Sequence, residues 1–181
     1  TYQSVSGAGQ NGLKDLQESN AGENLKKFIY PIKDNLIPHI DVFLENGYTK
    51  EEDKVIFETR KISGVQDLKI TCTAVRVPIS FCHGESVNFT TSKPTTVEEI
   101  KSILSQAPGV VLKDNIESNE YPMPFEITGS DWTYVGRIRE DKSFPNSFNC
   151  WIVADNIRRG AAANAVEILA ELINQGEQNV K

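Results

Sequence analysis

The segment Arg76-Val77-Pro78-Ile79-Ser80-Phe81-Cys82-His83-Gly84-Glu85-Ser86 contains a strand end and the connection that follows it. Residues 68–77 are rich in Ile, Val and Thr, which favours a strand, and Pro78 lacks the N–H that would continue it. Arg76 then offers a planar guanidinium that suits a carboxylate, and His83 in the connection can transfer protons near neutral pH. On residue types alone, a surface ion pair and a solvated histidine are the more common interpretation of Arg76 and His83.

The rest of the chain mixes helix and strand patterns without a regular strand-helix-strand repeat. Thr49 is an N-cap candidate for a helix over 50–62, and Thr95 with Glu98 has the capping-box spacing before a second helix. Strands are expected at 1–6, 65–77, 86–90, 110–112, 134–139 and 148–154, and a last helix at 157–174. The pattern predicts an α+β fold, with a mixed, mostly antiparallel sheet and helices on one face.

Composition narrows the class of protein. With 181 residues, 39% hydrophobic and 24% charged, the chain matches an ordinary globular protein, and no apolar run approaches the roughly 20 residues that cross a bilayer. A net charge of −6 does not favour nucleic acid or an anionic membrane as a partner. Three cysteines without metal-ligand spacing fit a reducing, cytoplasmic location and predict no metal site. The chain starts without Met, in the middle of a motif, which is typical of a fragment.

Arg76-Val77-Pro78 followed by His83 and Glu85-Ser86 resembles the signature of aspartate-semialdehyde dehydrogenases. Other segments resemble the same family in the same order, up to about Asn174. They are 1–9 (TYQSVSGAG), 37–41 (IPHID), 48–54 (YTKEEDK), 58–62 (ETRKI), 135–139 (VGRIR) and 155–162 (DNIRRGAA). The resemblance covers only the second part of such an enzyme. It implies the fold of the second domain of glyceraldehyde-3-phosphate-dehydrogenase-like enzymes.

The resemblance also implies a division of the chain and an activity. Residues 1–154 would form the dimerisation and catalytic domain, and residues 155–181 a C-terminal helix that packs on a nucleotide-binding domain absent from this chain. The enzyme would be a homodimer or tetramer. It would interconvert L-aspartyl 4-phosphate and L-aspartate 4-semialdehyde through a cysteine thioester, in lysine, methionine and threonine biosynthesis. NADP would be bound mainly by the absent domain.

The family's functional residues map onto individual positions here. His83 would be the catalytic acid/base. Arg76 would bind the substrate α-carboxylate, Glu51 the α-ammonium and Lys54 the phosphate, and Gln3 would lie beside the substrate. Residues i and i+3 share a helix face, so Glu51 and Lys54 can point into one cleft; Glu52 is a rival for Glu51. The cofactor contacts carried over are Ser6, Gly7 and Asn156, although Asn156 would serve equally well as an N-cap.

The family's nucleophile lies in a Ser-Asn-Pro-Asn-Cys-Ser-Thr type motif that this chain lacks. Cys72 and Cys150 fit buried apolar positions, and Cys82, although next to His83, is not a required residue of the family. The chain alone should therefore be inactive. Two alternatives remain: a fragment of the related N-acetyl-gamma-glutamyl-phosphate reductase, and a non-catalytic dimerisation module.

Overall fold

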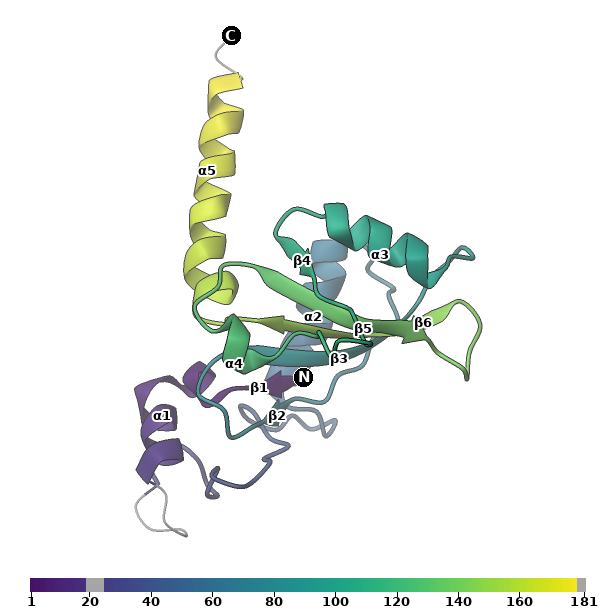
Figure 1. Ribbon diagram of the computed structural model, residues 1–181. Coiled ribbons are helices and arrows are strands. Elements are labelled where there is room, and N and C mark those ends of the chain that lie inside the picture. Colours follow the sequence, from purple (N-terminus) through teal and green to yellow (C-terminus); the bar gives the residue numbers. More distant parts are fainter. Residues whose placement is uncertain (19–24, 179–181) are drawn as a thin grey trace. The chain divides into compact units, whose positions relative to one another are not determined.

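The computed structural model describes residues 1–18 and 25–178, and the chain divides into two compact units, Thr1–Ser80 and Phe81–Lys181 (Figure 1). The first unit contains β1 (Tyr2–Gln3), the short helix η1 (Val5–Ala8), α1 (Gly9–Glu18), α2 (Lys50–Ser63) and β2 (Val75–Arg76). The second contains β3 (His83–Thr90), α3 (Val97–Gln106), β4 (Val110–Leu112), α4 (Pro124–Ile127), β5 (Thr133–Glu140), β6 (Ser147–Ala154), η2 (Arg158–Ala162) and α5 (Ala163–Gln178).

In the first unit, β1 and β2 run parallel, and Gln3 lies opposite Arg76 in their register. The small core consists of buried Val5, Ile32 and Ile37, with side chains of the α1 region packed around them. Helix α2 begins at Thr49, which caps it, and ends at Gly64, whose left-handed φ of 71° suits a residue without a side chain. The strand pair and the start of α2 carry the four predicted substrate-binding residues, Gln3, Glu51, Lys54 and Arg76.

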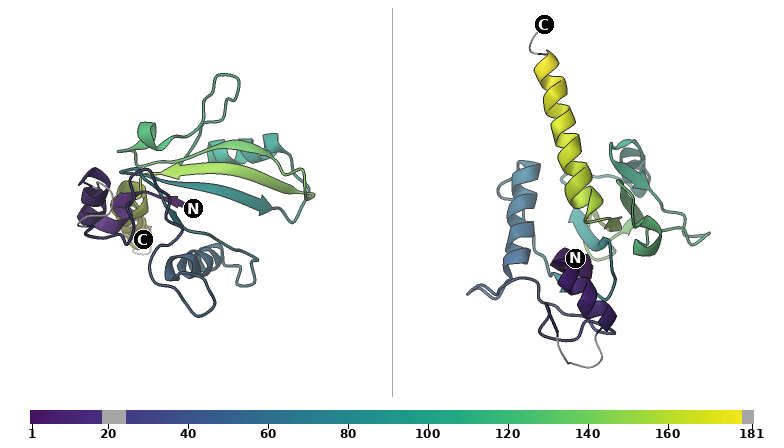
Figure 2. Two further views of the ribbon diagram at one scale, coloured as in Figure 1. Left: turned by 90° about the horizontal axis from the view of Figure 1, so that it is seen from below. Right: turned by 90° about the vertical axis from the view of Figure 1, so that its left-hand side faces the viewer.

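In the second unit, β6 pairs antiparallel with β3 on one side and β5 on the other, and β4 joins β5 in parallel. Figure 2 shows the twist of these strands and α3 lying against one face of them. The core on that face contains Ile100 of α3 together with Val135, Ile138, Phe148 and Cys150 of the strands. A smaller cluster of Cys82, Ile127 and Val153 joins α4 to the sheet. The α+β class and the mixed, mostly antiparallel sheet are confirmed.

Several expected elements differ from the structure. The strand expected over 65–77 is reduced to Val75–Arg76, because Ala74 N–H donates to the Glu52 side chain and not to a neighbouring strand. Ile62, the last apolar residue of the helix predicted over 50–62, is 86% exposed at the end of α2. His83, expected in a connection, opens β3, where it pairs with Ala154.

Two helix starts are also displaced. Thr96, not Thr95, is the N-cap of α3, and its capping-box partner is Glu99, not Glu98. The helix expected from residue 157 begins with a wide π-type turn, η2, before regular α5. α5 extends away from the sheet of its unit, as Figures 1 and 2 show. Residues 179–181 of the predicted C-terminal segment lie outside the described residues.

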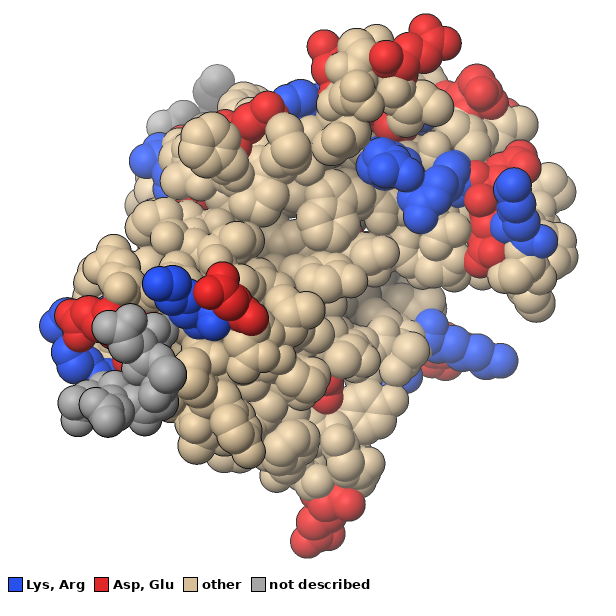
Figure 3. Space-filling view, turned by 60° about the horizontal axis from the view of Figure 1, so that its bottom comes forward, with Lys and Arg blue, Asp and Glu red and all other residues tan. Residues whose placement is uncertain are grey.

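Charges are mixed over the face drawn in Figure 3, where Lys and Arg side chains lie beside Asp and Glu side chains. Within residues 1–18 and 25–178, no helix has the length and apolar character needed to span a bilayer. The same part of the chain holds no group of three or more His, Cys, Asp or Glu side chains placed to bind a metal ion.

Candidate active site

The first turn of α2 presents two oppositely charged side chains on one face. Lys54 Nζ lies 2.6 Å from Glu51 Oε2, the i, i+3 pair that the helix spacing predicts. Lys54 keeps 51% of its side chain exposed, whereas Glu51 keeps 17%. The carboxylate is therefore held in place, and the ammonium at the end of its flexible stem can exchange partners.

The second oxygen of Glu51 joins this helix to the strand pair. Glu51 Oε1 accepts a hydrogen bond of 3.0 Å from Gln3 Nε2, and Gln3 lies opposite Arg76 in the β1–β2 register. The structure thus brings Gln3, Glu51, Lys54 and Arg76 together within one unit. Glu52, the rival for Glu51, points elsewhere: its carboxylate accepts from Thr49 and Ala74 N–H.

Arg76 is buried, with 6% of its surface exposed, which contradicts a surface ion pair. Its Nη1 donates to the carbonyl oxygen of Ser4 at 2.7 Å, and its guanidinium lies 6.0 Å from the centre of the Phe28 ring. A guanidinium has five N–H donors, and one bond to Ser4 leaves others able to bind a carboxylate in pairs. Burial strengthens such an ion pair by reducing the screening from water.

The pKa values of the group follow from these contacts. Burial alone would raise the pKa of Glu51, but hydrogen bonds from Lys54 and Gln3 and the charges of Lys54 and Arg76 lower it overall. The hydrogen bond to Glu51 raises the pKa of Lys54. Burial lowers the pKa of Arg76, against the opposing charge of Glu51. Glu51 therefore stays ionised, as a group that binds an ammonium must be.

Ser6 and Gly7, the predicted cofactor contacts of this unit, lie in η1. Ser6 is buried; its N–H donates to Ser80 O at 3.1 Å, and its hydroxyl lies 2.9 Å from that of Ser4. Gly7 N–H donates to Ser4 O, and the residue is exposed. The backbone N–H groups of both residues therefore donate to carbonyl oxygens of the same unit.

His83 and Asn156 belong to the second unit. His83 is half-buried at the first position of β3, and Asn156 is half-buried at the end of the connection that follows β6. The N-cap position of η2 is Ile157, not Asn156, and no side chain caps it. Asp155 Oδ1 accepts the N–H of Ile157 at 2.9 Å and that of Arg158 at 3.1 Å.

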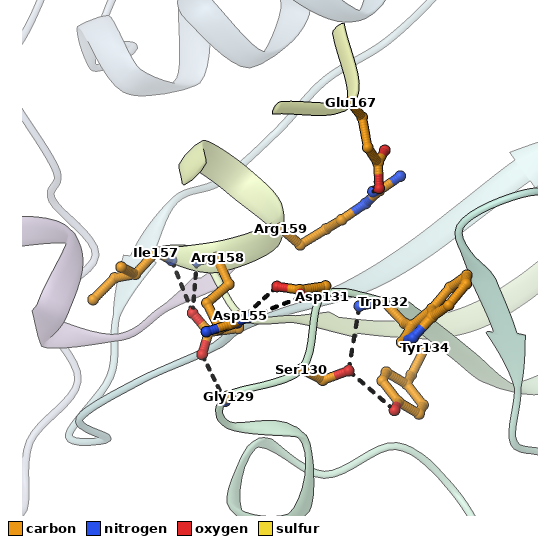
Figure 4. Close-up of polar contacts among 10 residues, drawn as sticks. All are labelled: Gly129, Ser130, Asp131, Trp132, Tyr134, Asp155, Ile157, Arg158, Arg159 and Glu167. Carbon is orange, nitrogen blue, oxygen red and sulfur yellow. Dashed lines mark hydrogen bonds and ion pairs between the residues drawn. The ribbon is translucent and has the colours of Figure 1, made fainter. Parts of the chain in front are cut away.

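Asp155 also binds a separate loop (Figure 4). It is 4% exposed, and its Oδ2 accepts the N–H of Gly129 at 2.9 Å. Beside it, Arg158 forms a two-bond ion pair with Asp131, at 2.7 and 2.8 Å, that joins the same loop to η2. The turn that carries Asn156 is thus fixed on both sides.

Neither Cys82 nor Cys150 has the environment of a nucleophile. Burial raises the pKa of the Cys82 thiol, with a further contribution from the charge of Asp155, and outweighs a hydrogen bond with Thr128. Burial and the charge of Glu85 raise the pKa of Cys150 to about 11. Cys72 is half-buried. A protonated thiol is a poor nucleophile, which agrees with a nucleophile outside this chain.

Sequence reasoning missed three contributors: the Ser4 carbonyl, the Glu52 carboxylate and Asp155. Two of these have a local sequence signal. Thr49 and Glu52 have the spacing of a capping box, and Asp155 directly precedes a helix. Their bonds to distant backbone, at Ala74 and Gly129, have no local signal because they depend on tertiary structure.

This chain is similar to known proteins over almost its whole length. Residues 1–159 match the family model described as semialdehyde dehydrogenase, dimerisation domain. An aspartate-semialdehyde dehydrogenase from Aquifex aeolicus is 46% identical over 97% of this chain and 54% of its own length. One from Legionella pneumophila is 44% identical over 97% and 52%. The chain thus spans about half the length of these curated relatives.

Solved structures are similar over the same part. Aspartate semialdehyde dehydrogenase II from Vibrio cholerae, in complex with ASA, is 39% identical with a TM-score of 0.90, over 96% of this chain and 53% of that one. An enzyme of the same name from Candida albicans, solved with NADP, is 24% identical with a TM-score of 0.57, over 74% of this chain and 43% of its own, and shares the fold. Because residues 1–159 match the family model, this chain belongs to the semialdehyde dehydrogenase dimerisation-domain family.

Proposed function

We propose that this chain is the substrate-binding and dimerisation part of an aspartate-semialdehyde dehydrogenase. The observation that carries the proposal is the position of Glu51, which is bonded to Gln3 and Lys54 and lies in the electrostatic field of buried Arg76. A small amino acid derivative has an ammonium and a carboxylate on one carbon, and this group offers one partner for each. The Vibrio cholerae relative, solved with ASA, supports the same substrate class.

The proposed reaction interconverts L-aspartyl 4-phosphate and L-aspartate 4-semialdehyde, on the route to lysine, methionine and threonine. In the reducing direction a cysteine thiolate outside this chain attacks the acyl carbon, and phosphate leaves. NADP, when bound, supplies the chemistry of hydride transfer. Arg76 and Glu51 would orient the substrate, and His83 would move the proton that addition to the carbonyl and release of the product require.

Lys54 gains a specific role in this scheme. Without substrate its ammonium is paired with Glu51. A substrate ammonium that binds Glu51 would compete with it, and Lys54, half exposed, would turn towards the phosphate. Binding of the amino acid end would thus provide a cation for the phosphate end.

Glu51 also argues against the first alternative. N-acetyl-gamma-glutamyl-phosphate reductase acts on an acetylated amine, which has no positive charge and so offers the Glu51 carboxylate no ion pair. The non-catalytic dimerisation module is distinguished by activity. We include a cytoplasmic homo-oligomer in the same proposal, with the family description supporting dimerisation.

The test is Glu51→Gln in a complete enzyme that joins this chain to its nucleotide-binding half. Losing one charge-assisted bond costs about 1.5–3 kcal/mol, so KM for the semialdehyde should rise about 10- to 100-fold. KM for NADP should stay within about twofold. Asp53→Asn, an exposed acid in the same helical turn, is the control and should change neither value.

An unchanged KM in Glu51→Gln would remove the basis of the proposal. Activity with the N-acetylated substrate in place of the semialdehyde would favour the reductase. A complete protein that forms dimers and reduces NADP with neither substrate in the presence of phosphate would favour the non-catalytic module.

A further inference from the structure

The buried carboxylate of Glu52 makes contacts that exceed those of a helix cap. Glu52 is 7% exposed, and both of its oxygens accept backbone N–H groups. Oε2 accepts from Thr49 at 2.8 Å, and Thr49 Oγ1 in return accepts the N–H of Glu52 at 3.3 Å, which completes a capping box. Oε1 accepts the N–H of Ala74, 22 residues further along the chain, at 2.9 Å.

The bond to Ala74 fixes the start of α2 to the strand that carries Arg76. Ala74 is completely buried and immediately precedes β2. On the other edge of β2, Val75 N–H donates to Thr1 O and Val77 N–H donates to Gln3 O, at 2.9 and 3.0 Å. Helix start, β2 and β1 are therefore linked through main-chain groups, with Glu52 as the side chain between helix and strand.

These links set the separation of the predicted substrate-binding groups. Glu51 precedes Glu52 directly, Arg76 lies two residues after Ala74, and Gln3 lies opposite Arg76. The 3.0 Å hydrogen bond from Gln3 to Glu51 links β1 directly to the start of α2. A displacement of the α2 start relative to β2 must open that bond and increase the distance between Glu51 and Arg76.

We infer that Glu52 is a positioning residue, which holds Glu51 at the distance from Arg76 that an α-amino acid requires. This inference rests on the proposed function, because it assigns Glu52 an effect on substrate binding through Glu51. Glu52 itself is enclosed by protein and does not touch the substrate. Sites of this kind lose affinity when their groups move by about 1 Å.

The chain offers a matched control at α3. Thr96 and Glu99 form a second capping box, with Thr96 N–H donating to Glu99 at 2.9 Å and Glu99 N–H donating to Thr96 at 3.2 Å. Glu99 has the same local chemistry as Glu52, and its carboxylate accepts from Thr95 and Thr96, next to it in the chain. Glu99→Gln therefore alters a cap without altering a bond between helix and strand.

The experiment compares Glu52→Gln, Glu51→Gln, their double variant and Glu99→Gln in the complete enzyme. In Glu52→Gln the new side-chain NH₂ would face the backbone N–H of either Thr49 or Ala74. Two donors cannot bond to each other, so one of these two hydrogen bonds must break. We expect KM for the semialdehyde to rise about tenfold, with KM for NADP within about twofold. Glu99→Gln should leave both values unchanged.

The double variant separates positioning from loss of stability. If Glu52 acts through Glu51, the double variant should have the KM of Glu51→Gln within about twofold, because the group being positioned is already disabled. The inference would be overturned if the KM increases of the two single variants multiplied in the double variant, or if Glu52→Gln raised KM no more than Glu99→Gln. Either result would leave the Glu51 proposal intact. An unchanged KM in Glu51→Gln would instead overturn the proposed function itself.

A failure of Glu52→Gln to fold would not end the test. Glu52→Asp keeps the charge but is one methylene shorter, so it cannot reach Thr49 and Ala74 together. The same KM pattern is expected for it, and a wild-type KM in a folded Glu52→Asp enzyme would contradict the bridging role.

Discussion

Single buried carboxylates determine much of the geometry of this protein. Asp15, Glu52 and Asp155 are each below 10% exposed, and each accepts backbone N–H groups from segments remote from its own helix or turn. Such bonds are stronger than neutral ones because the acceptor is ionised. In Asp15 and Glu52 these hydrogen bonds lower the pKa of the carboxyl against the opposing effect of burial, so their contribution to stability depends on pH.

Asp15 allows this dependence to be tested. It lies in α1, and its two oxygens accept the N–H groups of Lys26, Lys27 and Phe28 at 2.7–2.9 Å. Burial opposes ionisation, but these hydrogen bonds and the charge of Lys26 leave the pKa of Asp15 below its usual 3.8. A lowered folded-state pKa gives a stability contribution that is complete above pH 3.8 and is lost as pH falls below it.

We therefore predict that Asp15→Asn lowers the free energy of unfolding by about 2 kcal/mol at pH 7 and flattens its dependence on pH below about 4. Urea unfolding of the chain at several pH values measures both effects. Asp67→Asn, an exposed control in the first unit, should behave as the wild type. An equal loss for Asp15→Asn at pH 2.5 and pH 7 would show that its charge has no part in the effect.

At the scale of helices and strands, prediction succeeded where the signal was local. The predicted bounds agree with the structure to within a residue or two for the strands 110–112, 134–139 and 148–154 and for the helix after Thr49. Alternating hydrophobicity and helix caps depend on residues that are adjacent in sequence, so they can be recognised without a structure. The strand over 65–77 failed because strand formation needs a backbone partner, and the N–H of Ala74 donates to the Glu52 side chain.

The same distinction holds for the site. Gln3, Glu51, Lys54 and Arg76 were chosen by resemblance, and the structure brings them together. Their roles towards a substrate stay predictions, as do those of His83, Ser6, Gly7 and Asn156. The groups that hold them, such as the Ser4 carbonyl, carry no pattern because any residue type provides a carbonyl.

Gly136 shows how closely one strand packs against its surroundings. A Cβ at this position of β5 would lie 2.1 Å from Lys113 O and 2.7 Å from Pro122 Cδ. Gly160, near the start of the last helix, would place a Cβ no closer than 3.9 Å to another atom. The two glycines thus differ in available space within one unit.

We predict that Gly136→Ala destabilises the protein by about 3 kcal/mol, because backbone atoms must move to admit the methyl group. Its thermal unfolding midpoint should fall by about 10 °C, whereas Gly160→Ala should stay within about 2 °C of the wild type. Circular dichroism during heating measures both. Equal midpoints for the two variants would contradict the close contact with Lys113.

At the scale of the whole molecule, α5 has an apolar face that its own unit does not cover. The side chains on it are 53–67% exposed: Val166, Ile168, Leu169, Leu172 and Ile173. Their spacing follows the helical period, so they form one stripe. The predicted packing of residues 155–181 on a nucleotide-binding domain would cover this stripe, and the division at residue 154 stays a prediction.

Leu169→Glu tests that packing by comparing two proteins. In the chain 1–181 the side chain is 58% exposed, and the substitution should change the free energy of unfolding by less than about 0.5 kcal/mol. In the complete enzyme the same change would bury a charge, and the thermal midpoint should fall by several degrees. Equal small shifts in both proteins would show that the stripe is not covered.

The bond between Arg76 and the Ser4 carbonyl has a stereochemical consequence. It restrains the orientation of the guanidinium. In the proposed complex an incoming carboxylate would then approach Arg76 from a set direction, while Glu51 would fix the position of the amine. Two such anchors on one tetrahedral carbon would leave two positions, one for its hydrogen and one for the side chain that reacts. A mirror-image substrate that satisfied both anchors would direct its aldehyde away from the nucleophile, and the handedness of the reaction would then follow from the register of two short strands.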